Sequence, residues 1–200
     1  MAGRASPPSP LDAFIPEPDV RERFHVAVQA PPALVMDVAR DFDMQSVWLI
    51  RRIFRLRERL MGATPAEREP RGLLDEMTAL GWAVLADEPD KLLICGAACQ
   101  PWHADVVFEP VSPNDFAGYT EPDRVKIAWT LETEASGAST SVLRHETRVV
   151  ATDGAARARF RRYWRWARFG IIPIRLLLLP AIRRQAERRA GQARRSPSDG

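Results

Sequence analysis

The sequence predicts an α+β fold in which a curved antiparallel sheet of six or seven strands wraps around a long C-terminal helix. Residues 153–189 are rich in helix formers, arginine and aromatic side chains, which favours one long helix. The segments before it alternate between polar and apolar residues, as strands do. A strand-like segment and two helix-like segments come first. This order of elements is the main basis for the prediction.

Length and composition limit the chain to one domain with loose ends. A chain of 200 residues fits a single domain of ordinary size. Hydrophobic residues make up 46% of it, which excludes wholesale disorder. The proline- and serine-rich ends predict a disordered arm over residues 1–19 and a disordered tail over residues 191–200, around a domain at 20–190. The N-terminus lacks an apolar stretch of signal-peptide length, so we expect a cytoplasmic protein.

The domain begins with one strand and two helices. Residues 21–29 alternate as a strand, and Pro31 and Pro32 end it. A proline also suits the first turn of the helix that follows and reaches Phe42. Residues 45–61 form a second amphipathic pattern. We expect one further short helix at residues 73–80.

The middle of the chain is predicted to be antiparallel strands. After Gly81 the apolar period changes from 3.6 toward 2. The clearest hairpin joins the last two strands, because both alternate well and a glycine-containing turn separates them. The predicted strands cover residues 82–86, 92–99, 104–111, 116–120, 124–134 and 139–152.

The C-terminal helix carries two prolines inside its apolar pattern. Asp153 is suited to cap its N-terminus. Apolar residues then recur from Phe160 to Ile182 at spacings of three, four and seven. Pro173 and Pro180 each remove a backbone hydrogen bond. We therefore predict a kink or a break near residues 169–173.

Four segments resemble the START-like, or SRPBCC, superfamily of polyketide-cyclase-like and lipid-transfer-like proteins, and more narrowly its bacterial members without an assigned function. They are VAVQAPPALVMDVARDF, GWAVLADEPDKLLICGAACQPW, VKIAWTLETEASGASTSVLRHETRVVATD and ARARFRRYWRWARFGIIPIRLLLLPAIRRQAER. The resemblance spans residues 21–190 and concerns elements and apolar positions, with no catalytic motif. It implies a helix-grip fold with an apolar cavity between sheet and helix. Members bind lipids, sterols, polyketides or plant hormones, and a minority catalyse cyclisation, dehydration or hydrolysis.

The resemblance implies where a ligand lies but assigns no catalytic residue. Inward-facing positions on the strands and on the last helix would line the cavity, where aromatic rings stack on flat or apolar ligands. The alternative is that the same side chains form an ordinary core. The candidate lining residues are Trp82, Trp102, Val125, Ile127, Trp129, Leu131, Leu143, His145, Thr147, Phe160, Tyr163, Trp164 and Ala167.

Two histidines are weak candidates for acid–base chemistry. His145 is predicted to face inward, where it could orient a ligand carbonyl or act as a base, or be a satisfied core residue. His103 and Asp105 share a strand face, so they could form a couple, or His103 could simply be exposed at a strand end. His25, His103 and His145 show no ligand-type spacing, so we expect no metal and no cofactor.

The two cysteines, Cys95 and Cys99, are predicted to be small buried residues. Four residues apart on one strand, they point to the same face. Each step of two residues along a strand covers roughly 6.6–7 Å, and the cysteines are two such steps apart. This distance is longer than a disulfide can bridge. No second cysteine pair completes a zinc site.

Positive charge is concentrated at the C-terminal end. Residues 155–200 contain thirteen arginines and two acidic residues, while the whole chain has a formal charge of only +3. The main interpretation is a solvated helix face on an acidic body. Residues 169–182 are apolar except for Arg175, too short to span a bilayer but flanked by arginines, so residues 161–184 could make weak contact with an anionic membrane. No nucleic-acid-binding module accompanies the basic and aromatic residues, so we expect no nucleic-acid partner.

These features lead to one main functional hypothesis and two alternatives. The main hypothesis is binding or carriage of a small hydrophobic ligand (lipid, polyketide-like or aromatic) in the cavity. The first alternative is an enzyme of the cyclase, dehydrase or hydrolase kind that uses a cavity histidine. The second is a peripheral membrane protein that uses its basic and apolar C-terminal helix.

Overall fold

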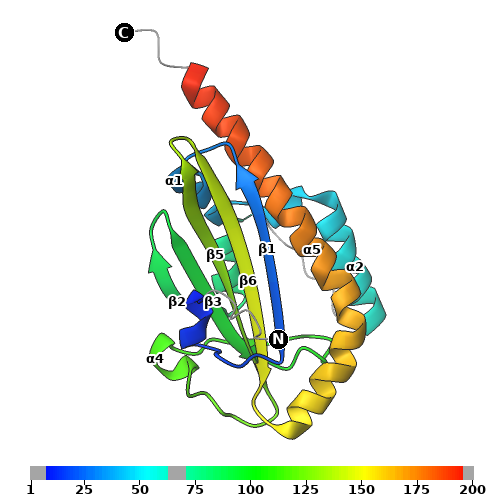
Figure 1. Ribbon diagram of the computed structural model, residues 1–200. Coiled ribbons are helices and arrows are strands. Elements are labelled where there is room, and N and C mark those ends of the chain that lie inside the picture. The colour runs from blue at the N-terminus through cyan, green and yellow to red at the C-terminus, as the bar shows by residue number, and fades with distance from the viewer. Residues whose placement is uncertain (1–7, 63–70, 196–200) are drawn as a thin grey trace, which may run out of the picture.

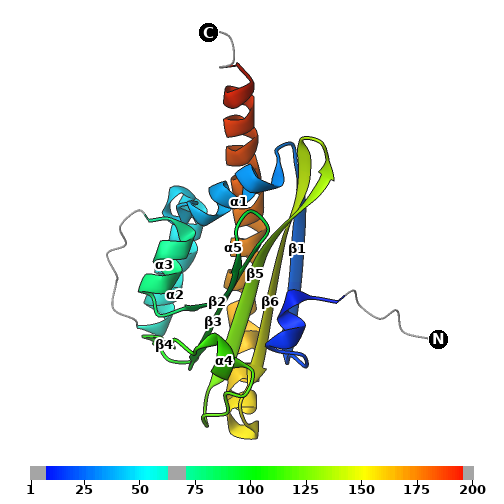
Figure 2. The ribbon, with the colours of Figure 1, turned by 90° about the vertical axis from the view of Figure 1, so that its left-hand side faces the viewer.

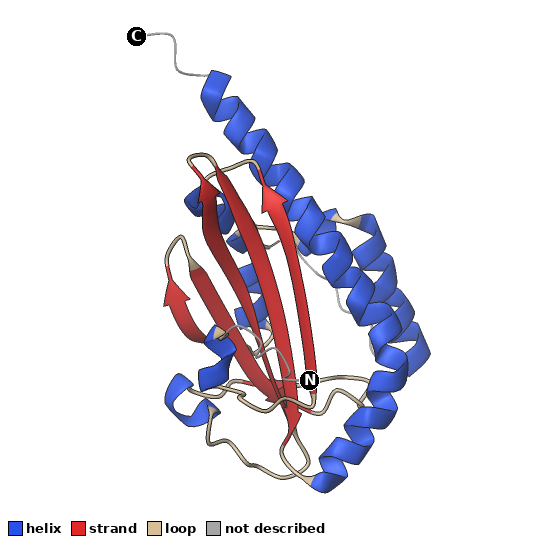
Figure 3. Cartoon of the chain, in the orientation of Figure 1, coloured by secondary structure: helices blue, strands red, loops and turns tan. Residues whose placement is uncertain are grey.

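The computed structural model of the chain describes residues 8–62 and 71–195. Six strands form one antiparallel sheet, and the long helix α5 packs against it (Figures 1 and 3), which confirms the predicted α+β architecture. The spatial strand order is β1-β6-β5-β3-β2, and β4 pairs with β3. The strands are β1 (Val20–Val28), β2 (Ala83–Glu88), β3 (Leu92–Cys99), β4 (Phe108–Glu109), β5 (Val125–Gly137) and β6 (Thr140–Ala151).

The helices follow the predicted order, with the short η1, η2 and α4 in addition. The predicted helices after β1 are confirmed, and α5 follows β6 directly. Figure 2 shows α1, α2 and α3 together on one side of the sheet, with the N-terminal segment on the other side. The helices are η1 (Pro10–Ala13), α1 (Pro32–Arg40), η2 (Met44–Ser46), α2 (Trp48–Met61), α3 (Leu73–Ala79), α4 (Pro113–Phe116) and α5 (Gly154–Arg195).

Register places the inward-facing residues of β1, β6 and β5 together. Trp129 of β5 lies opposite Thr147 of β6, and Leu131 lies opposite His145. On the other side of β6, Phe24 of β1 is paired with His145. These side chains share the face on which α1 and α5 pack, here called the inner face. The predicted alternation of the hairpin is therefore confirmed.

The inner face is packed most tightly near α1. There Leu178 and Ile182 of α5 join Leu93, Leu131 and Leu143 of the sheet in one buried cluster with α1. At the other end of the sheet, the N-terminal turns of α5 form a second cluster around a buried Phe160. Helix α5 crosses β1 and β6 rather than β2 and β3 (Figure 1). The two clusters therefore hold the two ends of a stretch of α5 that spans the sheet.

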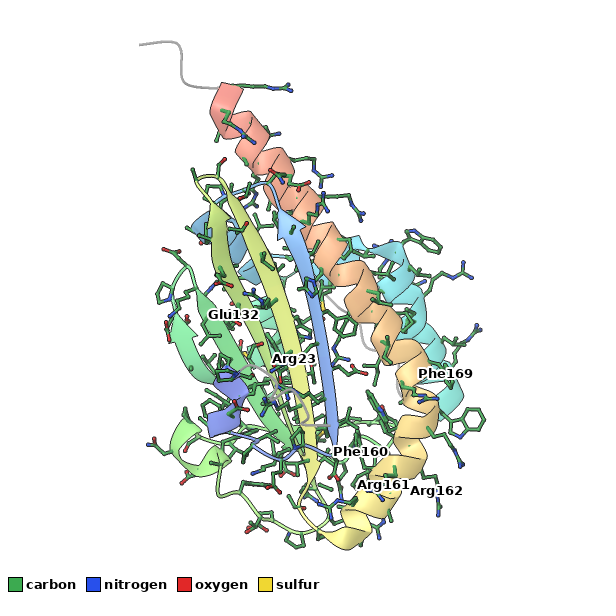
Figure 4. All side chains as sticks on the ribbon, in the orientation of Figure 1. Arg23, Glu132, Phe160, Arg161, Arg162 and Phe169 are labelled. Carbon is green, nitrogen blue, oxygen red and sulfur yellow. The ribbon has the colours of Figure 1, made fainter. Side chains whose placement is uncertain are left out.

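Helix α5 is unbroken despite its two prolines. Asp153 caps it as predicted, because its Oδ1 accepts a hydrogen bond from the Ala156 N–H at 2.7 Å. The predicted break is wrong, although Figure 4 shows the helix changing direction near Phe169. Pro173 has no N–H to bond the Phe169 carbonyl, which explains a bend at this point. The helix also continues to Arg195, so residues 191–195 are not the loose tail predicted, and residues 196–200 lie outside the described part.

The outer face of the sheet is covered by an N-terminal segment that the sequence predicted to be a disordered arm. Leu11 and Ile15 are fully buried there, in a cluster with Ile94 and Phe116. The prediction is therefore wrong for residues 8–19, whereas residues 1–7 lie outside the described part. A few buried apolar anchors, together with ion pairs to β6, hold a segment whose composition alone indicates disorder.

Two predicted strands are also corrected. Only Phe108–Glu109 of the predicted strand 104–111 pairs with β3. The predicted strand 116–120 does not form. Helix α4 ends at Phe116, after a start at which the Ser112 Oγ accepts from the Asp115 N–H, and residues 117–120 are a turn and irregular chain. Phe116 then turns inward to the outer-face cluster.

Candidate functional site on the inner face

The predicted lining residues fall into two groups on the inner face. Trp82 and five residues of the β5–β6 hairpin lie toward the middle of the sheet, whereas another six residues gather where α5 begins. Ala167 is partly exposed on α5, one helical repeat after Phe160. The middle group is Trp82, Trp129, Leu131, Leu143, His145 and Thr147. The second group is Trp102, Val125, Ile127, Phe160, Tyr163 and Trp164.

A chain of aromatic rings connects Trp82, just before β2, with β4 and β5. The Trp82 ring lies 6.2 Å from the Trp129 ring and 5.0 Å from the Phe108 ring. Trp129 in turn lies 6.2 Å from the His145 ring. Gly81 makes the approach to Phe108 possible, since its φ is +97° and a Cβ there would lie 2.3 Å from the Phe108 carbonyl oxygen. The ring of Trp82, the residue after Gly81, is thus held against Phe108.

Four polar side chains meet beside these rings. Arg175 of α5 donates from Nη1 to Glu22 Oε2 of β1 at 3.0 Å. It also donates from Nε to His145 Nε2 at 3.2 Å. Thr147 Oγ1 lies 3.1 Å from the same imidazole nitrogen. The cluster therefore ties α5 to β1 and β6 inside an otherwise apolar wall.

The imidazole of His145 is neutral and fully engaged. Its Nδ1 donates to the Thr130 carbonyl oxygen at 2.7 Å, so Nε2 is the acceptor for Arg175. Burial, and secondly the charge of Arg175, lowers the pKa of His145 to about 3. Both ring nitrogens are therefore occupied by protein groups at neutral pH.

Burial also shifts the pKa values of Glu22 and Arg175, which form an ion pair. It raises the pKa of Glu22, opposed by the positive charge of Arg175. Burial lowers the pKa of the Arg175 guanidinium, opposed by Glu22, but arginine stays protonated in proteins. The side chain of Arg175 is 17% exposed. Its Nη2 makes no hydrogen bond with the described residues. One donor of a charged group thus remains open at the apolar wall.

The state of His145 predicts a loss of stability in mild acid. Its folded-state pKa lies below its unfolded value of 6.5, so the stability it contributes is present above pH 6.5 and falls as the pH drops toward 3. At ~1.4 kcal/mol per pH unit, this group alone should lower the free energy of unfolding by about 2 kcal/mol from about pH 6.5 to about pH 5. Urea unfolding of the wild type and of His145→Asn at these two pH values measures the contribution of His145 to the loss. The asparagine keeps a donor for the Thr130 carbonyl oxygen. Equal acid losses in the two proteins would contradict the assignment.

The remaining histidines lie elsewhere. His25 lines a pocket beside the N-terminal segment, and the lining of this pocket also includes His145. His103 and Asp105 are exposed in the loop before β4, where they line a shallow pocket of about 120 Å³ with Gln100 and Glu109. The structure therefore does not bring the three histidines together. Within residues 8–62 and 71–195, no group of three or more His, Cys, Asp or Glu side chains is placed to hold a metal ion.

A larger pocket, of about 380 Å³, lies on the outer face beside the N-terminal segment. Arg23, His25, Glu132 and Arg144 line it, and Figure 4 labels two of them. Neither this pocket nor the one at His103 lies between α5 and the inner face. On the inner face itself, Trp82, Val84 and Ile127 remain partly exposed.

Both cysteines face inward and are buried, as predicted. Burial raises the pKa of Cys95 to about 12, which keeps it as a thiol. A buried thiol of this kind packs as a small apolar side chain rather than acting as a nucleophile.

Glu22, Phe108 and Arg175 were not among the predicted site residues. Two of them carried a signal in the sequence. Arg175 interrupts an apolar run of fourteen residues, and Glu22 occupies an inward position in the alternation of β1. A charged residue at a buried position indicates a partner. The partner lies 153 residues away, so only the folded register identifies it.

The order of elements, with a long C-terminal helix packed on an antiparallel sheet, is consistent with a helix-grip-like fold. No model of a known protein family matches the chain. No curated protein matches it significantly either.

Proposed function

We propose that the protein binds or carries a small hydrophobic ligand against the inner face of the sheet. The ligand would place an apolar or aromatic body against Trp82, Trp129 and Phe108, and an acceptor oxygen near Arg175. The resemblance to START-like, or SRPBCC, proteins supports this location, since members of that superfamily hold ligands between sheet and helix. The arrangement of aromatic rings supports a flat or aromatic body.

The open donor of Arg175 is the observation that carries the proposal. Nη2 is not among the fully buried side-chain atoms that lack a partner, so it is accessible from outside the protein and a ligand oxygen can replace water there. Arg175 uses Nε and Nη1 on protein partners, whereas Nη2 has no partner among the described residues. A ligand oxygen would accept the hydrogen bond that Nη2 has left to donate.

The ion pair with Glu22 indicates the chemical class of that oxygen. Glu22 lies 3.0 Å from Arg175 and neutralises its charge. A ligand carboxylate would bring a second negative charge beside Glu22, whose pKa is already raised by burial. A neutral acceptor, such as a ketone, ester or phenol oxygen, avoids this repulsion. The proposed ligand is therefore an uncharged, largely apolar molecule with an acceptor oxygen.

The geometry favours binding over catalysis by His145. A general base needs a free nitrogen within reach of the proton it removes. His145 has both nitrogens engaged and a pKa of about 3. In the proposed role it positions Arg175 instead.

A matched series of naphthalenes tests the proposal. Binding of 2-acetylnaphthalene, 2-ethylnaphthalene and 2-naphthoate should be compared by the quenching of tryptophan fluorescence. Hydrogen bonds to charged groups contribute roughly 1.5–3 kcal/mol, so we expect the ketone to bind about tenfold more tightly than the ethyl compound. The carboxylate should bind more weakly than the ketone.

A charge-neutral double variant supplies the control for the anchor. Glu22→Gln/Arg175→Met removes both charges together, so neither is left unpaired. It should keep binding of the ethyl compound and lose the preference for the ketone. Asp19→Asn/Arg157→Met removes another α5 ion pair, at 2.7 Å, and should behave as the wild type. Failure of all three probes to bind would contradict the proposed function, while an unchanged ketone preference in the first variant would contradict the role of Arg175.

A further inference from the structure

The side of α5 that faces away from the sheet carries both arginine and large apolar side chains. Trp166 is 70% exposed and Phe169 66% exposed. Leu176 is also exposed. With Arg162 and Arg165, these residues follow helical spacings of three, four and seven, which place them on one face. Figure 4 labels Arg161, Arg162 and Phe169 along this part of the helix.

Helix α2 carries a second stripe of the same composition. Trp48 and Leu56 are more than half exposed. Arg52, Arg55 and Arg59 are exposed at positions that share their helix face. The guanidinium of Arg52 lies 5.8 Å from the centre of the Trp48 ring. Its charge thus lies directly beside an exposed aromatic side chain, as in α5.

The two stripes lie on the same side of a helix pair. Helices α2 and α5 pack together, and a Cβ at Gly170 would lie 3.5 Å from the Ile53 side chain. Figures 1 and 2 show that the two helices run in opposite directions. At about 100° per residue from this contact, both stripes lie about a quarter turn away, in the same sense of rotation when each helix is viewed from its own N-terminus. For antiparallel helices, these two directions coincide.

The membrane contact predicted for residues 161–184 is therefore restricted to the exposed side chains of that stretch and extended to α2. Leu178, Leu179 and Ile182 are buried in the core and are not available to a partner. The exposed apolar residues come instead from residues 162–176 and from α2. In the described part of the chain, no helix is long and apolar enough to cross a membrane. The surface suits contact with a membrane rather than insertion across it.

We propose that this α2–α5 face, defined by Trp48, Arg52, Arg55, Leu56, Arg59, Arg162, Arg165, Trp166, Phe169 and Leu176, binds the surface of an anionic lipid bilayer. Aromatic and leucine side chains enter the boundary between headgroups and acyl chains, and arginines flanking them bind the lipid phosphates. Charge complementarity supports this partner, because residues 154–186 contain arginines and no acidic residue.

Contacts between arginine and aromatic side chains also fit a lipid interface. Arg165 lies 5.9 Å from the centre of the Trp166 ring, and Arg168 lies 5.1 Å from that of Phe169. Such pairs keep the charge at the level of the ring, where headgroup phosphates meet the apolar region. Arginine also binds phosphate through two parallel hydrogen bonds. The same side chains therefore serve both the apolar and the charged part of the contact.

Co-sedimentation of the full chain with vesicles tests the proposal. The probes are phosphatidylcholine vesicles with and without phosphatidylglycerol, at low and high salt. We expect binding that requires phosphatidylglycerol and weakens with salt. Trp166→Ser/Phe169→Ser should lower the partition coefficient about tenfold or more, since two large apolar side chains no longer enter the interface. Arg162→Glu/Arg165→Glu should abolish the dependence on phosphatidylglycerol.

Matched controls separate this face from general charge and hydrophobicity. Arg194→Glu/Arg195→Glu makes the same change in net charge on α5 outside the face. Val107→Ser removes an apolar side chain that is 71% exposed elsewhere. Both should bind vesicles nearly as the wild type does. No binding by the wild type, or unchanged binding by the serine variant, would overturn the proposal. So would tighter binding of single-stranded DNA than of vesicles, or a dimer that the serine variant dissociates while its vesicle binding is unchanged.

Discussion

Replacing Glu146 with alanine is expected to lower the free energy of unfolding by about 3–5 kcal/mol. Glu146 is only 7% exposed and accepts hydrogen bonds from Arg21 (2.8 Å), Arg23 (2.7 Å), Arg148 (2.7 Å) and the Ser9 hydroxyl (2.9 Å). Arg148 is 1% exposed. Removing the carboxylate leaves that guanidinium buried without its buried neutralising charge, since its other partner, Asp12, is 49% exposed.

The same network attaches the N-terminal segment to the outer face. Arg148 donates to the Ile15 carbonyl oxygen at 2.6 Å and pairs with Asp12 at 2.7 Å. Glu146→Ala should therefore also release residues 8–19, because Ser9 and Arg148 lose their shared acceptor. Limited proteolysis should cut the variant in this segment faster than the wild type.

Urea unfolding of Glu146→Ala measures the main effect. The matched control is Glu134→Ala, which removes a carboxylate paired with Arg144 where both side chains are exposed. Exposed pairs contribute about 0–1 kcal/mol, so the control should change little. Equal losses in the two variants would show that burial of the network does not matter.

Replacing Phe160 with alanine should lower the free energy of unfolding by about 3–5 kcal/mol. Phe160 is almost fully buried, with Trp164 stacked at 5.8 Å and Tyr163 at 6.4 Å between ring centres. Loss of its ring opens a cavity where α5 first meets the sheet. The N-terminal half of α5 has few other buried anchors among the described residues, since Ala156 is the other fully buried side chain there.

Trp166→Ala is the control for this prediction, since that ring lies on the same helix but is largely exposed. It should change the free energy of unfolding by about 0.5 kcal/mol or less. Chemical denaturation followed by circular dichroism compares the two variants. A loss below about 1 kcal/mol for Phe160→Ala would mean that α5 is held mainly by its C-terminal half.

The sheet was predictable where one periodic pattern determines the structure. Strands β5 and β6 alternate over many residues, so their inward positions, from Val125 to Thr147, follow from the sequence. The N-terminal segment was not predictable in the same way. Its anchors Leu11 and Ile15 are isolated apolar residues among prolines, and they are ordered by contact with a face that alternation marks as solvent-exposed.

The part of the candidate site on β5 and β6 was predicted, whereas its ion pair was missed. Trp129, His145 and Thr147 follow from strand periodicity. The ion pair of Glu22 and Arg175 depends on where α5 crosses β1, which no local pattern specifies. A break at Pro173 was expected from the missing hydrogen bond, but packing of α5 on both sides of it keeps the helix continuous.

The six tryptophans allow the most direct test of ligand binding at the inner face. Their indole N–H signals should be followed by NMR during titration with 2-acetylnaphthalene, after assignment by single Trp→Phe substitutions. Trp82 and Trp129 lie on the inner face, whereas Trp48 and Trp166 are exposed on the α2–α5 face. We predict saturable shifts of the first two signals and none of the last two. Shifts confined to Trp48 and Trp166, or no saturable shift of Trp129, would contradict a ligand site on the inner face.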